Sequence, residues 1–416
     1  MSFPRMVRIR QHFDDDPIAD PRATAHEAAA SLLEGAPIRP GQTVAITGSS
    51  RGIANIAEII AGAVAALKEA GLRPFVVPAM GSHGGGTAEC QAAVLHHYGV
   101  TEEAVGAPVR SCTDTVTLCH TPEGIPVVLD RLAAEADHIL AVNRIKPHTH
   151  LTGPLESGLA KILVIGLGKP AGALTYHRAF MKHGFNEVFH AAVPLVLEHT
   201  SVLGGLGIIE NALDHTARIV PVRSSEILER EPELLRDATA RMAKLPFDNI
   251  HVLVVDQIGK DVSGAGMDTN IIGRDRPGPH IEVIFVRDLT AASEGNAIGI
   301  GLADVTVRRL VDKTNAEATF LNCATCMHLE LIRMPYAFDT DREALAGAIS
   351  GTTVTDPTDA RIVWIRSTLA LTEMEVSEPL VPELAGRTDI EVLGEPHPFG
   401  FQPNGALADA FEPPLG

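Results

Sequence analysis

Short apolar runs alternate along the first half of the chain with longer stretches in which apolar residues recur every three or four positions. Residues 43–52 form an apolar run that ends in small residues, and residues 53–72 follow with helical periodicity. The same order repeats from residue 73 to residue 100, and a third apolar run occupies residues 137–148. This rhythm of strand, loop and helix predicts an α/β fold with a largely parallel sheet. In such sheets ligands bind at the loops beyond the carboxyl ends of the strands.

The second half of the chain restarts the pattern after a charged helical stretch at residues 224–248. A strongly apolar strand is predicted at residues 249–259, and a β-rich start after a polar helix is typical of a domain boundary. We therefore expect two α/β domains with largely parallel sheets, residues 1–247 and residues 248–416, and an active-site cleft between them.

Three further strands are predicted in the second half, at residues 280–289, 317–325 and 360–368. The last part of the chain differs in composition, because five prolines follow Gly394. We expect this tail to be extended and loosely ordered.

Composition narrows the class of protein. The chain has 416 residues, 45% of them hydrophobic, and its net charge of −18 disfavours nucleic acid or an anionic membrane as a partner. No apolar run approaches the roughly 20 residues that a membrane span requires. The acidic N-terminal segment is unlike an export signal, and five scattered cysteines indicate reduced thiols. We expect a cytoplasmic protein.

Two loops in the first half place reactive side chains among glycines. The first contains Thr47, Ser49, Ser50 and Arg51, whose backbone N–H groups and guanidinium suit a carboxylate or phosphate. It lacks the spacing of a P-loop or a dinucleotide fingerprint, so a simple turn after a strand is the alternative interpretation. The second loop carries His83 between glycines, either as a functional group or as an ordinary surface histidine.

The third loop and the segment after it are the most informative. His148 and His150 follow a proline, and Lys161 then stands within an apolar run. Burial of a lysine lowers its pKa and favours the reactive neutral amine, although a structural lysine that reaches solvent is the alternative. His177 follows 16 residues after Lys161. The pair Cys323 and Cys326 lacks a second pair for zinc and is interpreted as two small buried thiols.

These segments resemble the nickel-dependent lactate racemase family, whose members racemise or epimerise 2-hydroxy acids. The resemblance rests on the segment Ser157-Gly-Leu-Ala-Lys161, on His177 and on the glycine-loop histidine, and it covers most of the chain. It implies that Lys161 covalently holds a nickel pincer nucleotide (pyridinium-3,5-bisthiocarboxylic acid mononucleotide nickel) and that His177 is the protein ligand to nickel. Thr47, Ser49 and Ser50 are then expected to contact the cofactor.

The resemblance further implies that His83 and His148 are the two acid/base groups and that Arg51 binds the substrate. Lys260 is expected to add a second positive contact. Gly84 replaces the arginine that is usual after the first histidine, and the 13 residues from His148 to Lys161 exceed the usual spacing. His150 therefore competes for the second acid/base role, and these differences point to a divergent branch.

The implied reaction inverts C2 of a 2-hydroxy acid by proton-coupled hydride transfer through a 2-keto acid. A hydride acceptor of this kind must come from a cofactor, and histidines titrate near neutral pH. Enzymes that build and load the cofactor are implied partners. A lysine Schiff-base enzyme acting on a carbonyl substrate and a non-catalytic nickel- or nucleotide-binding protein are the alternatives. The 2-hydroxy acid itself, whether lactate, malate, a longer acid or a sugar acid, and the oligomeric state stay open.

Overall fold

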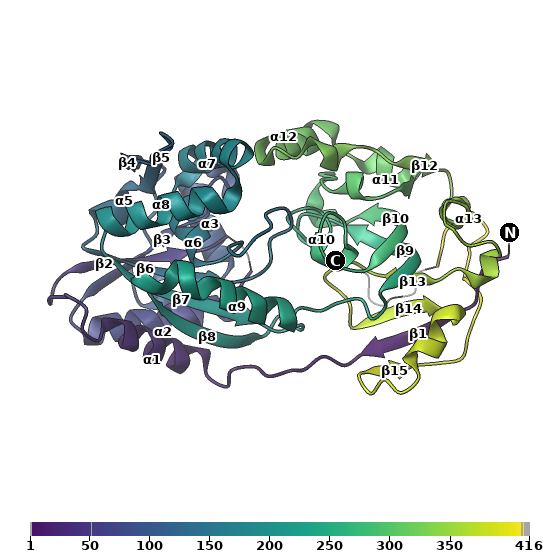
Figure 1. Ribbon diagram of the computed structural model, residues 1–416, viewed down its shortest axis with the longest axis horizontal. Helices are drawn as coiled ribbons and strands as arrows, with labels where there is room; N and C mark the ends of the chain where they lie inside the picture. The colour runs from purple at the N-terminus through teal and green to yellow at the C-terminus, as the bar shows by residue number, and fades with distance from the viewer. Residues whose placement is uncertain (1, 51, 409–410, 412–416) are drawn as a thin grey trace. The chain divides into compact units, whose positions relative to one another are not determined.

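The chain folds into two compact α/β units, which the computed structural model describes over residues 2–50, 52–408 and 411. The N-terminal unit runs from Asp14 to Met242, and the C-terminal unit combines Met1–Phe13 with Ala243–Gly416 (Figure 1). The α/β class predicted from the sequence is confirmed.

The N-terminal unit is built on a five-stranded sheet in the order β3-β2-β6-β7-β8. The first four strands are parallel, and β8 runs antiparallel to β7. A separate hairpin is formed by β4 and β5. The strands are β2 (Thr43–Gly48), β3 (Arg73–Pro78), β4 (Thr115–His120), β5 (Pro126–Asp130), β6 (His138–Arg144), β7 (Val202–Glu210) and β8 (Thr216–Arg223).

Helices cover both faces of this sheet because successive strand residues point to opposite sides. Val44 and Ile46 of β2 pack in one apolar core with α1 and α2, whereas Ala45 between them packs in another core with α7 and α8 (Figure 1). The helices are α1 (Pro21–Leu33), α2 (Ile56–Glu69), α3 (Ala88–His97), α4 (Glu102–Val105), α5 (Arg131–Glu135), α6 (Leu159–Lys161), α7 (Lys169–His183), α8 (Phe185–His199) and α9 (Ile227–Arg241).

The C-terminal unit contains an eight-stranded mixed sheet in the order β12-β11-β10-β9-β13-β14-β1-β15. The first five strands of this order are parallel, and β14, β1 and β15 continue it in antiparallel pairing. Its strands are β1 (Met6–Gln11), β9 (Asn249–Ile258), β10 (His280–Leu289), β11 (Val305–Val307), β12 (Tyr336–Phe338), β13 (Ile362–Ile365), β14 (Glu373–Ser377) and β15 (Ile390–Val392). Its helices are α10 (Thr269–Ile272), α11 (Arg308–Lys313), α12 (Ala316–Cys326) and α13 (Asp341–Ser350).

The first strand of the chain pairs away from the residues that follow it. β1 lies between β14 and β15, with Met6 opposite Ser377. The division predicted from the sequence kept residues 1–247 together, whereas the backbone hydrogen bonds of β1 are made inside the C-terminal unit. Pairing between distant segments depends on tertiary structure, and the local apolar pattern of β1 carries no information about its partner.

One predicted strand is a helix. Residues 317–325 were expected to form a strand, but they lie in α12. Asn315 caps this helix by accepting the N–H of Ala318, and the buried residues Thr319 and Cys323 are four positions apart. Residues with this spacing lie on one face of a helix, so a helix can bury both. This burial outweighs the strand preference of the β-branched and aromatic residues in the segment.

The tail after Gly394 is also different from the prediction in its described part. Phe399, Leu407 and Phe411 are buried in the apolar core of the C-terminal unit beside Trp364. Prolines prevent regular helix there, but extended chain can still bury aromatic side chains.

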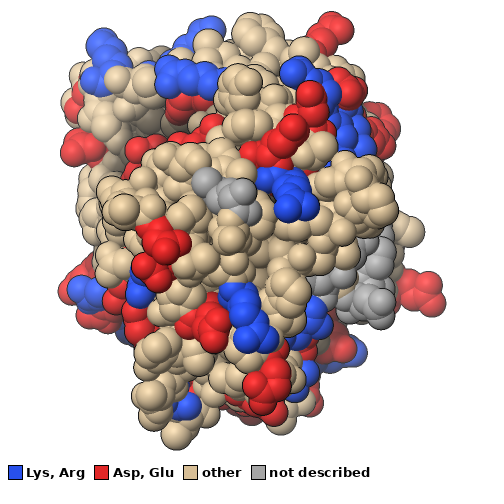
Figure 2. All heavy atoms as spheres, turned by 90° about the vertical axis from the view of Figure 1, so that its right-hand side faces the viewer, with Lys and Arg blue, Asp and Glu red and all other residues tan. Residues whose placement is uncertain are grey.

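Figure 2 shows acidic and basic side chains interspersed over the face that it presents. Among the residues described, none of the helices has the length and apolar character needed to cross a membrane. All five cysteines have free thiols.

Candidate functional site

The loops that follow β2, β3 and β6 lie beside one another because these strands are parallel neighbours in the N-terminal sheet. The strands end at Gly48, Pro78 and Arg144, immediately before the three loops that the sequence singled out. One contact joins the first two loops directly, since Ser50 Oγ lies 2.6 Å from His83 Nδ1. The carboxyl edge of the sheet is therefore the candidate site.

The end of β2 and the first loop contain two buried hydroxyls. Thr47 is fully buried, and its hydroxyl donates to the carbonyl oxygen of Val142 at 3.1 Å and accepts the N–H of Val142 at 2.7 Å, so it joins β2 to β6. Ser49 Oγ is buried without a hydrogen-bond partner among the described residues. A buried hydroxyl in this state is costly, so it is suited to a polar atom of a ligand. Arg51, which was predicted to bind the substrate, lies outside the described residues.

The second loop has a backbone that only glycine adopts readily. Gly84, Gly85 and Gly86 have φ values of 64°, 68° and 72°, and Gly81 has a φ of 58°. A side chain at these positions would be strained, so the sequence of glycines fixes the path of the loop around His83. His83 itself is exposed on this loop.

A buried network that sequence reasoning missed lies under the second loop. Gln91 Nε2 donates to the carbonyl oxygens of Gly81 at 2.8 Å and His83 at 3.2 Å. Gln91 Oε1 accepts from Lys169 Nζ at 3.2 Å, and Lys169 forms an ion pair of 2.9 Å with Asp130. All three side chains are fully buried. Lys169 stands in the same apolar run as Lys161, so its burial could have been predicted from the sequence. Nothing in the sequence links it to Gln91.

The third loop is held by a carboxylate and by a histidine ring. The backbone N–H of His148 donates to Glu156 Oε2 at 2.6 Å, and Glu156 is buried. His148 Nδ1 accepts the backbone N–H groups of His150 and Leu151, each at 3.1 Å. The rings of His148 and His150 are 6.3 Å apart between centroids. Both predicted histidines thus lie in the same turn, and the ring of His148 organises its backbone.

Lys161 is half-buried on α6. This short helix is the first turn of a longer helical segment, which continues through the π-helical turn Ile162–Gly166 toward α7. The amino end of this segment meets a buried carboxyl group, because Glu231 Oε2 accepts the N–H of Ala160 at 2.9 Å. Burial is the main cause that raises the pKa of Glu231 to about 7, while the N–H groups of Ala160 and Leu159 lower it. This contact could not be predicted from the sequence, since Glu231 is one of many charged residues on α9.

His177 lies half-buried on α7, the helix that follows this π-helical turn, with its ring 6.1 Å from that of Phe180. Among the described residues no group of three or more His, Cys, Asp or Glu side chains could hold a metal ion. A metal at this histidine would therefore need most of its donors from elsewhere.

Lys260 belongs to the C-terminal unit, directly after β9. Its backbone N–H donates to Ser293 Oγ at 3.3 Å, and its ammonium group contacts Asn322 Oδ1. This loop is held by a hydroxyl and an amide.

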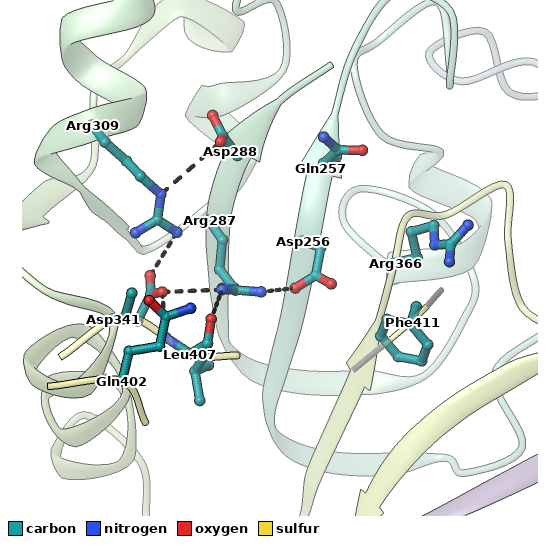
Figure 3. Close-up of a pocket in the computed structure, with 11 residues that line it drawn as sticks. Asp256, Gln257, Arg287, Asp288, Arg309, Asp341, Arg366, Gln402, Leu407 and Phe411 are labelled. Carbon is teal, nitrogen blue, oxygen red and sulfur yellow. Dashed lines mark hydrogen bonds and ion pairs between the residues drawn. The ribbon is translucent and has the colours of Figure 1, made fainter. Parts of the chain in front are cut away.

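A cavity of about 270 Å³ in the C-terminal unit contains none of the predicted site residues. Its charged groups are largely paired with one another, since Arg287 forms ion pairs with Asp341 at 3.0 Å and with Asp256, while Arg309 pairs with Asp341 at 2.7 Å (Figure 3). Because these charges already neutralise one another, we assign the candidate site to the loop cluster of the N-terminal unit.

The fold and this cluster define a class: an α/β protein of two units in which the loops after parallel strands carry histidines and a lysine-bearing helical segment begins beside them. Comparisons with known proteins show what this part of the chain resembles. Residues 36–188 match the model of the lactate racemase N-terminal domain. All the described site residues from Thr47 to His177 lie inside this match, so this part of the chain is similar to that domain.

Two solved structures share the fold. A protein from Thermotoga maritima aligns with a TM-score of 0.55 and 14% identity over 86% of this chain and 99% of that chain. The lactate racemase apoprotein from Thermoanaerobacterium thermosaccharolyticum aligns with a TM-score of 0.51 and 15% identity over 88% of this chain and 99% of that chain. A search of curated protein sequences finds no match.

Proposed function

We propose that this protein is a racemase or epimerase that inverts C2 of a 2-hydroxy acid with a nickel pincer nucleotide attached to Lys161. The observation that carries the proposal is the convergence of three loops at one sheet edge, inside the segment that matches a lactate racemase domain. Two of these loops carry His83, His148 and His150. Lys161 lies on α6, which follows the loop that carries His148 and His150.

The residues present fit such a cofactor. Ser49 Oγ is a buried hydroxyl without a partner among the described residues, as expected for a contact with a phosphate or ring substituent. His177 would supply one imidazole to nickel, and the absence of a larger ligand cluster among the described residues agrees with a metal whose other donors belong to the cofactor. When bound, the cofactor would supply an electron-poor ring able to accept hydride, which no side chain provides.

The histidines are suited to the proton part of the reaction. Hydride leaves C2 as the hydroxyl gives its proton to one base, and the opposite base supplies a proton to the oxygen when hydride returns to the other face of C2. A base on each side of the substrate serves one enantiomer in each direction. Ser50 holds Nδ1 of His83, so the ring is oriented by a neighbouring hydroxyl.

For the second acid/base group the hydrogen bonds favour His150 over His148. Nδ1 of His148 accepts two backbone N–H groups, so it carries no proton in this arrangement. The neutral ring therefore carries its proton on Nε2 and could take up another proton only at Nδ1, by giving up these two hydrogen bonds, which makes it a poor base. We therefore propose that His148 shapes the turn and that His150 exchanges the proton.

Cations are proposed to bind the carboxylate of the substrate. Arg51 offers a planar pair of donors, and Lys260 would add a positive charge from the loop after β9. Cytoplasmic 2-hydroxy acids are the proposed substrate class, and the enzymes that assemble and attach the cofactor are the proposed partners.

The test is expression of the chain together with cofactor-making enzymes, followed by intact-mass and peptide mass spectrometry. We expect a mass increase confined to the peptide that contains Lys161, bound nickel, and inversion of an enantiopure 2-hydroxy acid detected by chiral chromatography. The Lys161→Arg variant should retain the fold and lose the adduct. An unmodified, inactive chain from this co-expression would contradict the proposal, whereas borohydride trapping of a carbonyl compound at Lys161 without nickel would support the Schiff-base alternative.

A further inference from the structure

A buried acid lies directly beneath the segment that carries Lys161, and the proposed chemistry does not use it. Glu231 is 1% exposed on α9. Its Oε2 accepts the N–H of Ala160 at 2.9 Å, one residue before Lys161. Its Oε1 is buried without a hydrogen-bond partner among the described residues. A carboxyl group in this position is expensive to bury, and only one of its oxygens has a hydrogen-bond partner among the described residues.

The contact is close enough to dictate the residue at position 158. A Cβ atom placed on Gly158 would lie 2.3 Å from Glu231 Oε1 and 2.5 Å from the carboxyl carbon. The backbone at Gly158 is extended, with φ −176°, so space and not backbone strain excludes a side chain. The glycine of the Ser157-Gly158 segment therefore makes room for the carboxyl group.

Other bonds fix the same turn from its opposite side. Asn143 Nδ2 donates to the carbonyl oxygen of Gly158 at 2.8 Å, and the backbones of Lys146 and Ser157 pair at 2.9 Å and 3.3 Å. With Asn143 holding the last carbonyl before the helix and Glu231 holding an N–H of its first turn, the start of the segment is restrained on both sides. The direction of the first turn sets where the side chain of Lys161 leaves the backbone.

From this geometry we infer that Glu231 is a positioning residue for Lys161: its carboxylate holds the first turn of the helical segment and so fixes the amine that receives the cofactor. The inference rests on the proposed function for the role of Lys161 as tether, but the restraint itself is a property of the chain without cofactor. A carboxylate at the amino end of a helix both accepts an N–H and interacts favourably with the helix dipole.

The charge state of Glu231 makes the restraint testable. Because burial raises its pKa to about 7, the group gains its negative charge across neutral pH and is mostly neutral below. The neutral carboxyl accepts the Ala160 N–H less strongly than the carboxylate does. The restraint should therefore strengthen as pH rises through about 7.

Charged side chains other than Glu231 occur on α9 and on the elements that pack against it. The elements that pack against α9 are α6, β7, β8 and the 3₁₀ turn Ser224–Glu226. Their charged side chains, together with those of α9 itself, are Lys161, Glu210, Arg218, Arg223, Glu226, Glu229, Arg230, Glu233, Arg236, Asp237 and Arg241. Several pair elsewhere: Glu210 with Arg144, Arg218 and Arg241 with Asp237, and Arg230 with Glu233 at 3.7 Å. Lys161 is the charged residue on the turn that Glu231 holds.

The experiment measures amide hydrogen exchange and amine labelling in the chain purified without cofactor. Exchange of the peptide that spans residues 157–163 is followed between pH 5.5 and 8.5 and corrected for the intrinsic effect of pH. Labelling of Lys161 by acetic anhydride is quantified by peptide mass spectrometry at the same pH values. We expect protection of the Ala160 amide to rise several-fold across pH 7 in the native chain.

Glu231→Gln should abolish this pH dependence and label Lys161 at least roughly threefold faster at pH 8, because the turn that carries Lys161 opens more often. Glu229→Gln, the same change at an exposed position of α9, is the matched control and should behave like the native chain.

Identical exchange and labelling profiles for the native chain and Glu231→Gln would overturn the inference. If Glu231→Gln does not fold, the native chain alone tests the inference. A hydrogen-exchange profile of the native chain that does not change near pH 7 also contradicts the inference. Failure of the proposed function would appear separately, as a chain that never gains an adduct at Lys161 while its exchange still depends on Glu231.

Discussion

At the scale of single residues, the local bonds of the two histidines in the third loop distinguish their roles. His148 and His150 have similar burial, and in the sequence only their spacing from Lys161 distinguishes them. The structure adds that Nδ1 of His148 is occupied by two backbone donors. Hydrogen-bond partners decide which nitrogen of a histidine carries the proton, and these partners come from the folded turn.

Replacing each of these histidines by asparagine separates the two roles. His150→Asn should lower inversion of the 2-hydroxy acid by roughly 10²- to 10⁴-fold, the usual contribution of a general acid or base. His148→Asn should stay within about tenfold, because the asparagine oxygen can still accept an N–H of the turn. Chiral chromatography of reactions with cofactor-loaded protein measures both, and His120→Asn on exposed β4 is the control. A larger loss for His148→Asn would return the acid/base role to that residue.

At the scale of secondary-structure elements, the candidate site depends on buried polar side chains that connect neighbouring elements. Lys169 at the start of α7 contacts Asp130 at the end of β5, the carbonyl oxygen of Pro78 at the end of β3, and Gln91 of α3. Lys169 adopts a left-handed backbone with φ 56°, a conformation that costs free energy in a non-glycine residue. The ion pair and its hydrogen bonds offset that cost and hold the His83 loop.

The variant Lys169→Met should therefore destabilise the fold. It leaves Asp130 buried without its cation, and breaking a buried pair in this way costs about 3–5 kcal/mol. Urea unfolding followed by far-UV circular dichroism measures the loss. Lys182→Met on the exposed side of α7 is the control and should change stability by less than about 0.5 kcal/mol. A loss below 1 kcal/mol for Lys169→Met would mean that this ion pair does not stabilise the loop.

At the scale of the whole molecule, the C-terminal unit is closed by segments that are distant in sequence. The first strand and the last residues both belong to the C-terminal unit, where β1 pairs with β14 and Phe399 and Phe411 pack around Trp364. The tail is thus part of a core and not a flexible extension in its described part.

Truncation of one tail aromatic tests this conclusion. Phe399 is 8% exposed, and its ring stacks on Trp364 with centroids 6.1 Å apart. Phe399→Ala should lower the free energy of unfolding by about 3 kcal/mol or more, because it removes buried aromatic surface and leaves a cavity. Trp364 is the single tryptophan of the chain, so its fluorescence during urea unfolding reports on the C-terminal unit. Leu369→Ala, at a residue that is 56% exposed, is the control. Equal midpoints for the two variants would contradict a packed tail.

The sequence could predict the features that depend on local periodicity. The apolar run and the helical spacing after it correctly placed β2, α2, β3 and β6, because strand and helix periods are properties of neighbouring residues. The positions of the three loops at one sheet edge follow from the same rhythm. The strand predicted at residues 317–325 was wrong because a short apolar segment fits the period of a strand and that of a helix equally well. Only the folded structure shows which of its side chains are buried.

What the sequence determined by itself is the α/β class and the identity of the loops that carry histidine, lysine and glycine at their characteristic spacings. Tertiary structure alone decided that β1 joins the distant sheet, that Gln91 and Lys169 support the His83 loop, and that Glu231 meets Gly158. The physical reason is that burial and hydrogen bonding between distant segments depend on which surfaces meet after folding. No pattern of neighbouring residues encodes those partners directly.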